Sequence, residues 1–521
     1  MKLPIGIQDF EKIRTGGYLY IDKTEHVYRL VSEGAYYFLS RPRRFGKSLL
    51  ISTLKALFQG KRELFKGLAI DKKDDWDWAE HPIMHLDLNT NKYDKAEVLE
   101  KKLDDSLSEW EAMYGCARPD LPFGMRFEKV IRSAYEKTGR RVVILVDEYD
   151  KPMLQAIGNE TLQSEFRGTL KGFYGALKSM DACIKFAMLT GVTKFGKVSV
   201  FSDLNNLMDI SMYPKYHDIC GITEQELLSV FDKQIDELAE ENGLTREDCI
   251  AKMKKMYDGY HFNEFSKGGI YNPFSVLNTF SNYIFRSYWF ETGTPTYLVT
   301  LLRRHHYSLE QMSKAEVTAD VLNSIDAESS DPIPVIYQSG YLTIKGYKER
   351  FKKYILGFPN EEVEEGFVKY LAPFYLDNYK TEEKKRSVFD VELFADDVES
   401  GNPEQFCRRL KSLLASAPYD AELDREGNYQ NVIWVVFKML SFYTQSEYKT
   451  SDGRIDLLIE TPQYRYVMEF KLDGTAEEAL QQIKDRQYLL PYTLDEKTTY
   501  MVGINFSKDI RTIEKYLIEK D

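Results

Sequence analysis

The stretch that most constrains the fold is residues 36–58, which read YYFLSRPRRFGKSLLISTLKALF. A short apolar run leads into a basic loop that ends in Gly46, Lys47 and Ser48, and apolar residues at helical spacing follow. A strand, a loop ending in Gly-Lys-Ser and a helix are together typical of a phosphate-binding P-loop. Backbone N–H groups at the helix start would receive phosphate oxygens, with Lys47 reaching the β- and γ-phosphates and Ser48 binding Mg²⁺.

One position departs from the full pattern. The motif G-x-x-x-x-G-K-[ST] has glycine at its first position, and this chain has Arg41 there. On the Gly-Lys-Ser triplet alone, a basic N-terminus of an ordinary α/β helix is an equally good interpretation.

A second strand favours the P-loop. Residues 141–152 read RVVILVDEYDKP, in which 142–146 are continuously apolar, as in a buried parallel strand. Ligands of open α/β sheets bind outside the carboxyl ends of the strands, where Asp147 and Glu148 would lie. Asp147 can orient Mg²⁺ or its water, and Glu148 can polarise an attacking water. Two solvated acids at a strand end are the alternative.

Two further strands are predicted at 83–88, where apolar and polar residues alternate, and at 184–189. The second ends in TGVTK, where Thr190 or Thr193 could sense the γ-phosphate. A plain Thr-Gly turn explains this segment equally well, and the two threonines are equally placed.

The size and charge of the chain set its broad class. Its 521 residues suffice for about three domains, and a hydrophobic fraction of 43% argues against global disorder. A net charge of −12 argues against a wholly basic nucleic-acid coat but leaves room for a local basic groove. Five scattered cysteines without a CxxC motif indicate neither a disulfide framework nor a zinc site. Without a signal-like or membrane-spanning apolar run, we expect a soluble cytoplasmic protein.

From about residue 211 the pattern becomes helical. Thr223 to Glu226 is a capping-box pattern that predicts a helix through Ile235, and Thr245 opens another helix through Met256. Three aromatic-rich stretches follow at 257–262, 270–277 and 288–295. Their rings could stack on bases, but packing at helix junctions is favoured.

A β-hairpin is predicted next. Residues 335–345, broken by Gly340, form one strand and 353–358 its partner. The segment KGYKERFKK (345–353) places basic residues beside aromatic ones. It is either a nucleic-acid contact or a solvated hairpin tip, and the tip is favoured.

The last hundred residues predict a second α/β unit, with a turn at 451–454. Its expected elements are a helix at 429–440, strands at 442–448, 455–461 and 464–472, a helix at 476–488 and a final strand at 500–505.

Asp456, followed on the neighbouring strand by Glu469-x-Lys471, has the spacing of metal-dependent nucleases. Two carboxylates would hold Mg²⁺, which lowers the pKa of a bound water, and the lysine would position that water. Glu426 before the first helix could add a metal ligand, and Gln482 on the following helix could line the same face. The alternative is a solvated sheet face with an ordinary Glu–Lys pair, because D…ExK alone is a weak pattern.

Taken together, these motifs resemble a bacterial family that joins an AAA-ATPase-like domain to a C-terminal PD-(D/E)XK nuclease-superfamily domain. The resemblance covers essentially the whole chain and is carried by YIDKT, RPRRFGKSLL, VDEYDKP, TGVTKF, YDGYHF, YNPFSVL, YWFETGTP, SGYLTI, FPNEEV, GRIDLLIE, VMEFKL and AEEALQQIK. It implies that Arg41 is the family's normal form of the loop. The arginines of this loop could contact phosphates or act on a neighbouring subunit of an oligomer.

The resemblance and the motifs lead to an α/β fold with domains at 1–212 (P-loop), 213–385 (mostly helical, with the hairpin) and 386–521 (nuclease-like). The predicted ATP-binding residues are Arg43, Arg44, Phe45, Gly46, Lys47, Ser48, Leu49, Asp147 and Thr190. The predicted catalytic residues are Glu148, Asp456, Glu469 and Lys471. The predicted Mg²⁺ ligands are Ser48, Asp147, Asp456, Glu469 and Glu426.

Two functions fit this organisation. In the first, ATP binding and hydrolysis control a Mg²⁺-dependent nuclease that acts on DNA or RNA. In the second, the nuclease fold is inactive and the protein is a nucleotide-switched module that binds nucleic acid or a protein. A weaker third possibility is a sensor or assembly platform that does not turn ATP over. Homo-oligomerisation is left open, and no membrane association is expected.

Overall fold

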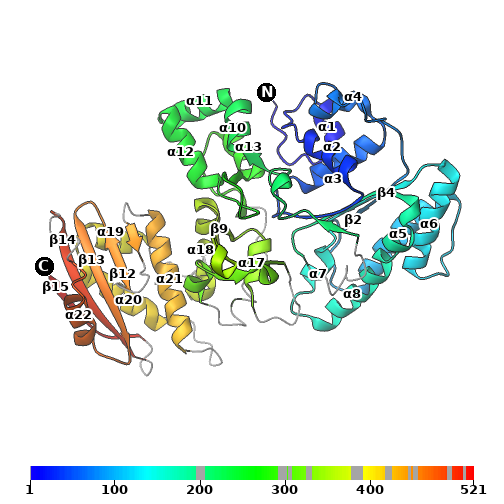
Figure 1. The fold of residues 1–521 in the computed structure, drawn as a ribbon. Coiled ribbons are helices and arrows are strands. Elements are labelled where there is room, and N and C mark those ends of the chain that lie inside the picture. The colour runs from blue at the N-terminus through cyan, green and yellow to red at the C-terminus, as the bar shows by residue number, and fades with distance from the viewer. Residues whose placement is uncertain are drawn as a thin grey trace, which may run out of the picture. The chain divides into compact units, whose positions relative to one another are not determined.

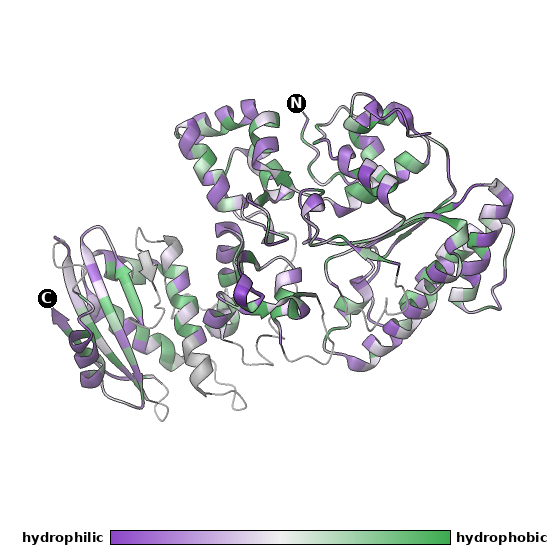
Figure 2. Ribbon diagram, viewed as in Figure 1, coloured by the Kyte–Doolittle hydropathy of each residue, from purple (hydrophilic) through white to green (hydrophobic). Residues whose placement is uncertain are grey.

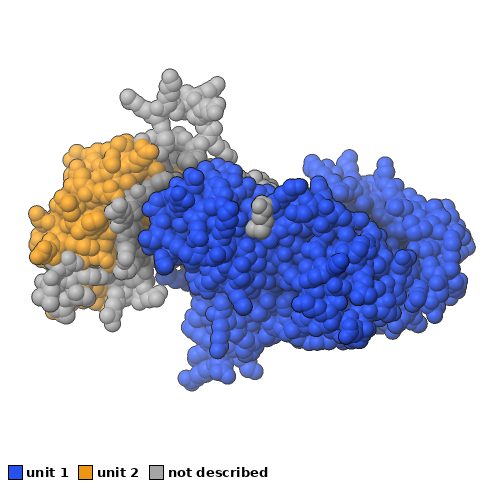
Figure 3. All heavy atoms as spheres, turned by 90° about the horizontal axis from the view of Figure 1, so that it is seen from above, with its two compact units in different colours: residues 1–298, 313–363 blue, residues 299–312, 364–521 orange. Residues whose placement is uncertain are grey.

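The computed structural model describes residues 2–194, 206–290, 302, 308–323, 331–376, 391–416, 425–443, 447–449, 456–489, 496–507 and 512–521. The chain forms two compact units, one of residues 1–298 and 313–363 and the other of residues 299–312 and 364–521 (Figure 1, Figure 3). Both contain sheets and helices, which confirms the α/β class. The division of the sequence into three domains stays a prediction.

A five-stranded parallel sheet forms the centre of the first unit, in the order β2-β3-β4-β1-β5. Its β1 and β3 are buried along their whole length, as their continuous apolar runs predict, and Figure 2 shows the strands as largely hydrophobic. Because β4 lies between β1 and β3, the ends of these three strands meet at one edge. The strands are β1 (Tyr36–Ser40), β2 (Ile83–Asp87), β3 (Val142–Asp147), β4 (Ile184–Gly191) and β5 (Met208–Asp209).

Helices cover this sheet on both sides, with α1 to α3 on one side and α7 and α8 on the other (Figure 1). Left-handed glycines, Gly115 and Gly139, end α5 and α6. The helices are α1 (Phe10–Thr15), α2 (Thr24–Glu33), α3 (Lys47–Phe58), α4 (Arg62–Phe65), α5 (Ala96–Tyr114), α6 (Phe123–Thr138), α7 (Lys151–Gln155), α8 (Glu160–Tyr174) and α9 (Ala176–Ser179).

The rest of the first unit is mainly helical. The capping box at Thr223 is present, but the predicted single helix is two, because Phe231 leaves helical geometry and stacks on Phe280, 5.0 Å between ring centroids. The elements are β6 (Ile222–Thr223), α10 (Glu224–Val230), α11 (Asp232–Glu241), α12 (Arg246–Tyr257), β7 (Ile270–Tyr271), α13 (Pro273–Asn282), β8 (Glu316–Thr318), α16 (Ala319–Asn323), α17 (Ile333–Gln338), β9 (Thr343–Lys348) and β10 (Lys353–Gly357).

The predicted strand at 335–345 is wrong in its first half, which is helix α17. Pro334 sits in the first turn of α17, where its fixed φ suits a helix and its missing N–H costs nothing. Gly340 then takes φ +90, and the strand β9 begins only at Thr343. Its hairpin partner β10 is antiparallel to it, as predicted.

A mixed sheet of order β11-β12-β13-β14-β15 forms the second unit, in which only β13 and β14 pair in parallel. Two predictions are wrong here: Phe442 belongs to a helix, and the polar edge strand β15 follows the strand expected to be last. The elements are α15 (Leu309–Met312), α19 (Val391–Glu399), α20 (Pro403–Ser416), α21 (Arg425–Tyr443), β11 (Glu447–Lys449), β12 (Leu457–Glu460), β13 (Tyr464–Leu472), α22 (Ala476–Asp485), β14 (Thr498–Ser507) and β15 (Thr512–Lys520), and the boundary between the units falls within α18 (Glu361–Tyr375).

The turn predicted at 451–454 lies outside the described residues. Along the parts of the chain that are described, no helix has the length and apolar character needed to cross a membrane.

Candidate functional site

The loop between β1 and α3 bends back on itself at two left-handed residues, Arg44 (φ +68) and Gly46 (φ +95). Gly46 caps α3, whose first residues are Lys47 and Ser48. The Lys47 ammonium is buried and donates hydrogen bonds to the carbonyl oxygens of Arg41 (3.0 Å) and Pro42 (3.1 Å). The lysine therefore lies across its own loop, at the N-terminus of the helix.

A polar cavity of about 270 Å³ opens in front of this loop. Six of the predicted nucleotide-binding residues line it, together with Glu148 from the end of β3. Phe45, Asp147 and Thr190 are not in its wall. The six are Arg43, Arg44, Gly46, Lys47, Ser48 and Leu49.

Sequence reasoning missed several residues in the wall of this cavity. Asn89 follows the carboxyl end of β2 and accepts a hydrogen bond from Lys151 Nζ (3.1 Å), and both residues line the cavity. The predicted strand at 83–88 was a usable signal for Asn89, because ligands bind beyond strand ends. Residues 6–8 and Phe274 are also in the wall, and they carry no comparable sequence signal.

Asp147 and Thr190 form a pair behind the cavity. The Thr190 hydroxyl donates to Asp147 Oδ1 at 2.6 Å, and both side chains are buried at the ends of β4 and β3. Glu148, the next residue, has a left-handed backbone (φ +51), a conformation that is uncommon for residues other than glycine. This conformation separates the two acids: Asp147 turns to Thr190, and Glu148 lines the cavity.

Thr193 has a different partner from Thr190. The structure therefore distinguishes the two threonines, which the sequence places equally well for sensing the γ-phosphate. The backbone N–H and the hydroxyl of Thr193 both donate to Asp150 Oδ2 at 2.6 Å, and the N–H of Val192 joins them at 3.0 Å. Burial, reinforced by the charge of Glu148, raises the pKa of Asp150 to about 6. Asp150 therefore holds the segment after β4.

Arg41 points away from the cavity. Its guanidinium is buried and donates to the carbonyls of Ser211 (2.8 Å) and Tyr216 (3.0 Å), with the Phe262 ring 3.9 Å from its Cζ. Burial lowers its pKa to about 10, so it remains charged at neutral pH. In the described structure this residue ties the loop to neighbouring segments, and Arg43 and Arg44 are the loop arginines that reach the cavity.

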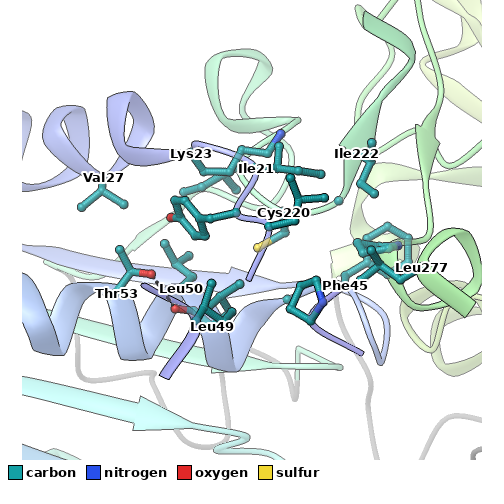
Figure 4. Close-up of a pocket in the computed structure, with 18 residues that line it drawn as sticks. Ile21, Lys23, Val27, Phe45, Leu49, Leu50, Thr53, Cys220, Ile222 and Leu277 are labelled. Carbon is teal, nitrogen blue, oxygen red and sulfur yellow. Dashed lines mark hydrogen bonds between the residues drawn. The ribbon is translucent and has the colours of Figure 1, made fainter. Parts of the chain in front are cut away.

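An apolar pocket of about 110 Å³ adjoins the polar cavity and shares Gly46, Leu49 and Leu277 with it. Figure 4 shows side chains converging on this pocket from α3, the N-terminal segment and the 219–222 segment. The residues labelled there are Ile21, Lys23, Val27, Phe45, Leu49, Leu50, Thr53, Cys220, Ile222 and Leu277.

The described parts of the aromatic-rich stretches are packed, as predicted, and residues 291–295 lie outside the described residues. The rings of Tyr257, Tyr260 and Tyr271 are buried, and Tyr288 and Trp289 are nearly so. The Phe45 ring stands edge-on to Tyr260, 4.7 Å between centroids, so this cluster supports the loop that ends in Gly46.

In the second unit, the predicted nuclease residues lie together at one end of β12 and β13. Asp456, just before β12, accepts from the backbone N–H of Phe470 (2.9 Å), and its own N–H points to Glu469 Oε2 (3.4 Å). Glu469 is buried, and burial together with the negative charge of Asp456 raises its pKa to about 7.

Gln482 of α22 links the other two members of this group. Its side-chain oxygen accepts from Lys471 Nζ (2.5 Å), and its amide nitrogen donates to Glu469 Oε1. The backbone of Glu426 lies in the first turn of α21 rather than before the helix, and its side chain is outside what the structure describes.

Known protein families match both the N-terminal and the C-terminal part of the chain. Residues 4–201 match the family described as predicted AAA-ATPase, and residues 424–516 match the PD-(D/E)XK nuclease superfamily. A protein of Azotobacter chroococcum mcd 1, named only as an uncharacterized protein in the vnfD 5' region, is 37% identical over 530 residues and covers 99% of each chain. The chain belongs to the family that joins a predicted AAA-ATPase domain to a PD-(D/E)XK nuclease-superfamily domain.

Proposed function

We propose that this protein binds and hydrolyses ATP in its first unit, and that its nucleotide state controls Mg²⁺-dependent cleavage of nucleic acid by its second unit. The observation that carries the ATP proposal is the pair of adjoining cavities at the start of α3. One is polar and basic, and the other is apolar, as the two ends of a nucleotide require.

The polar cavity suits the triphosphate. Arg43, Arg44 and Lys47 supply positive charge. The first N–H groups of α3 and the positive end of its dipole also favour a negatively charged ligand at the start of the helix. The adjoining apolar pocket suits the base, because apolar side chains, Leu49 and Leu277 among them, line it. This division assigns recognition of the phosphates and the base to different walls.

Ser48 in the cavity wall and Asp147 behind it offer the oxygen donors that Mg²⁺, a hard cation, prefers. When bound, Mg²⁺ would supply charge that offsets the phosphate oxygens. Thr190 would hold Asp147 in place through its 2.6 Å hydrogen bond. Glu148, in the cavity wall, would accept a proton from an attacking water.

The second unit also fits a divalent cation. Asp456 and Glu469 are neighbouring carboxylates, and burial, reinforced by their mutual repulsion, raises the pKa of Glu469 to about 7. A cation would relieve that repulsion and would supply an activated water. Lys471, positioned by Gln482, would orient this water or neutralise the scissile phosphate. We further propose a cytoplasmic location, to which the five free cysteines are suited.

The test is cleavage of single- and double-stranded DNA and RNA with Mg²⁺ or Mn²⁺, with and without ATP. Wild type is compared with Lys47→Ala and Lys471→Ala. We expect Lys471→Ala to lose cleavage but keep ATP hydrolysis, and Lys47→Ala to lose ATP hydrolysis and its effect on cleavage. Cleavage that survives in Lys471→Ala would overturn the nuclease assignment. Nucleic-acid binding that depends on ATP, without any cleavage, would indicate a switched binding module with an inactive nuclease fold.

A further inference from the structure

The hairpin of β9 and β10 concentrates positive charge on an acidic protein. Residues 343–353 contain five basic residues and one acidic residue, in a chain whose net charge is −12. The strands are joined by a short turn at 349–351, and Lys352 follows it with a left-handed backbone (φ +50). Residues 347–352 are all exposed, so the charge lies at the surface.

The pairing of the strands keeps like charges together. Lys348 and Lys353 are register partners, and like charges directly opposite each other destabilise a sheet. The Glu316 carboxylate of β8 forms an ion pair with the Lys348 ammonium. Among the described residues, Arg350, Lys352 and Lys353 have no ion-pair partner. The hairpin therefore presents cations that its own neighbours do not neutralise.

Aromatic rings lie among these cations. The Phe351 side chain is 61% exposed at the turn, and the guanidinium carbon of Arg350 lies 5.4 Å from its ring centroid. Tyr347 is 36% exposed on β9 and rests against Tyr354, 4.9 Å between centroids. An exposed phenylalanine at a charged tip contributes nothing to the core, but it is an available surface for stacking.

We infer that this hairpin binds single-stranded nucleic acid, with phosphates at Arg350, Lys352 and Lys353 and bases stacked on Phe351 and Tyr347. Cations beside exposed rings are the arrangement that single strands favour, because unpaired bases offer their faces for stacking. A duplex hides those faces, and an acidic protein or a lipid surface would use the charge without needing the rings. This inference rests on the proposed function for the choice of nucleic acid, but it does not depend on cleavage.

The test uses the full-length protein and labelled oligothymidylate, oligouridylate and a DNA duplex, with affinity measured across a salt series. We expect Phe351→Ala to weaken binding of both single strands at least about fivefold, through lost stacking. We expect Arg350→Gln to lower the slope of log affinity against log salt by about 0.7, because one phosphate contact is lost. Both side chains are exposed, so neither change should affect folding.

Two control variants remove the same kinds of side chain, an exposed ring and an exposed cation, at positions outside the hairpin. Phe265→Ala removes another exposed ring (69% exposed), and Lys233→Gln removes another exposed cation, on α11. Both should bind single strands as wild type does. Unchanged affinity in Phe351→Ala and Arg350→Gln would overturn the inference, as would equal losses in the controls. So would binding of the duplex in preference to single strands, or of phosphatidylserine vesicles or polyglutamate in place of oligonucleotides.

Cleavage and ATP hydrolysis are measured on the same preparations, which separates this inference from the proposed function. Hairpin-dependent binding without any cleavage would support the inference and overturn the nuclease activity. Cleavage of nucleic acid, with binding unchanged in the hairpin variants, would support the nuclease activity and overturn the inference about the hairpin.

Discussion

Gly503 of β14 lies directly beside Glu469 of β13 in the parallel pairing of the two strands. A Cβ atom at Gly503 would lie 2.4 Å from the carbonyl oxygen of Ala476 and 2.7 Å from the backbone nitrogen of Leu480. Both of those atoms belong to the backbone of α22, which cannot swing aside as a side chain does. The missing side chain of Gly503 is thus what lets α22 approach closely enough for Gln482 to reach Glu469.

Gly503→Ala should therefore displace α22 and separate Gln482 from Glu469 and Lys471. We expect the second unit to lose about 1–3 kcal/mol of stability through overpacking, and cleavage to fall with it. Thermal unfolding and the nuclease assay measure the two effects. Gly168→Ala in α8, where nothing lies within 4 Å, is the control and should be neutral or stabilising. Equal behaviour of the two variants would contradict the close-approach argument.

The two threonines after β4 should behave differently. Thr190→Val removes the hydroxyl that donates to buried Asp147, which should cost about 1–3 kcal/mol and lower ATP hydrolysis. Thr193→Val leaves Asp150 with two backbone donors, from Val192 and residue 193 itself, so its effect on hydrolysis should be smaller. Steady-state ATP hydrolysis of the two variants decides between them. A larger loss in Thr193→Val would reverse these assignments.

The P-loop, its buried parallel strands and the nuclease-like elements could be predicted because each depends on local pattern. An apolar run of strand length, a Gly-Lys-Ser triplet and the period-two pair of Glu469 and Lys471 are visible in short stretches of sequence. The roles of Thr190 and Thr193 could not be separated in this way, since their partners come from elsewhere in the chain: Asp147 ends β3 and Asp150 precedes α7. The sequence gives spacing along the chain, but the partner of a side chain depends on which strands become neighbours.

The errors in the elements have the same origin. The break in the helix at Phe231 depends on Phe280, which is far away in the sequence. The capping box at Thr223 indicates only where the helix begins. The edge strand β15 is rich in charged residues, so its apolar alternation is weak, and it is held by backbone pairing with β14. Asn89 and Gly503 matter because of what the fold brings to them, and neither residue type marks a site by itself.

The role of Arg41 can be tested by restoring the glycine of the full motif. Arg41→Gly should weaken both ATP binding and stability, although it improves the match to the motif. It leaves the buried carbonyl of Ser211 without the Arg41 donor, at about 1–3 kcal/mol, and the Tyr216 carbonyl keeps only the weaker hydrogen bond from the Ile219 N–H. Nucleotide titration and thermal unfolding measure the outcome, with Arg44→Ala as control. The exposed Arg44 lines the cavity, so its loss should weaken ATP binding with little change in stability. Wild-type stability of Arg41→Gly would show that Arg41 does not tie these segments together.

Asp150 should make stability depend on pH. Its folded pKa of about 6 lies above the ordinary value of 3.8, so the folded state holds this proton more tightly than the unfolded state. The resulting stabilisation is complete below about pH 4 and is lost as the pH rises through 6, by roughly 3 kcal/mol. The asparagine side chain in Asp150→Asn cannot ionise, so this variant does not lose that stabilisation as the pH rises. The difference in unfolding midpoint between wild type and Asp150→Asn should therefore shift in favour of Asp150→Asn between pH 4 and 7.5. A difference that does not change with pH would contradict the raised pKa.

Gln482 should act on cleavage through Lys471 and Glu469 rather than through folding. Gln482→Met has similar length but neither donates to Glu469 nor accepts from Lys471, so both groups lose the partner that sets their position. We expect cleavage to fall about tenfold or more, in the range seen when the outer partners of metal-site residues are lost, with ATP hydrolysis unchanged. Gln481→Met is the matched control, because the neighbouring Gln481 is exposed and its side chain donates to Asp485 of the same helix. Because Lys471 is then free to move, the Gln482→Met variant should also show a cleavage rate that depends differently on pH from wild type. Full cleavage by Gln482→Met would mean that Lys471 and Glu469 are positioned without α22, and equal losses in both variants would point to the helix rather than the hydrogen bonds.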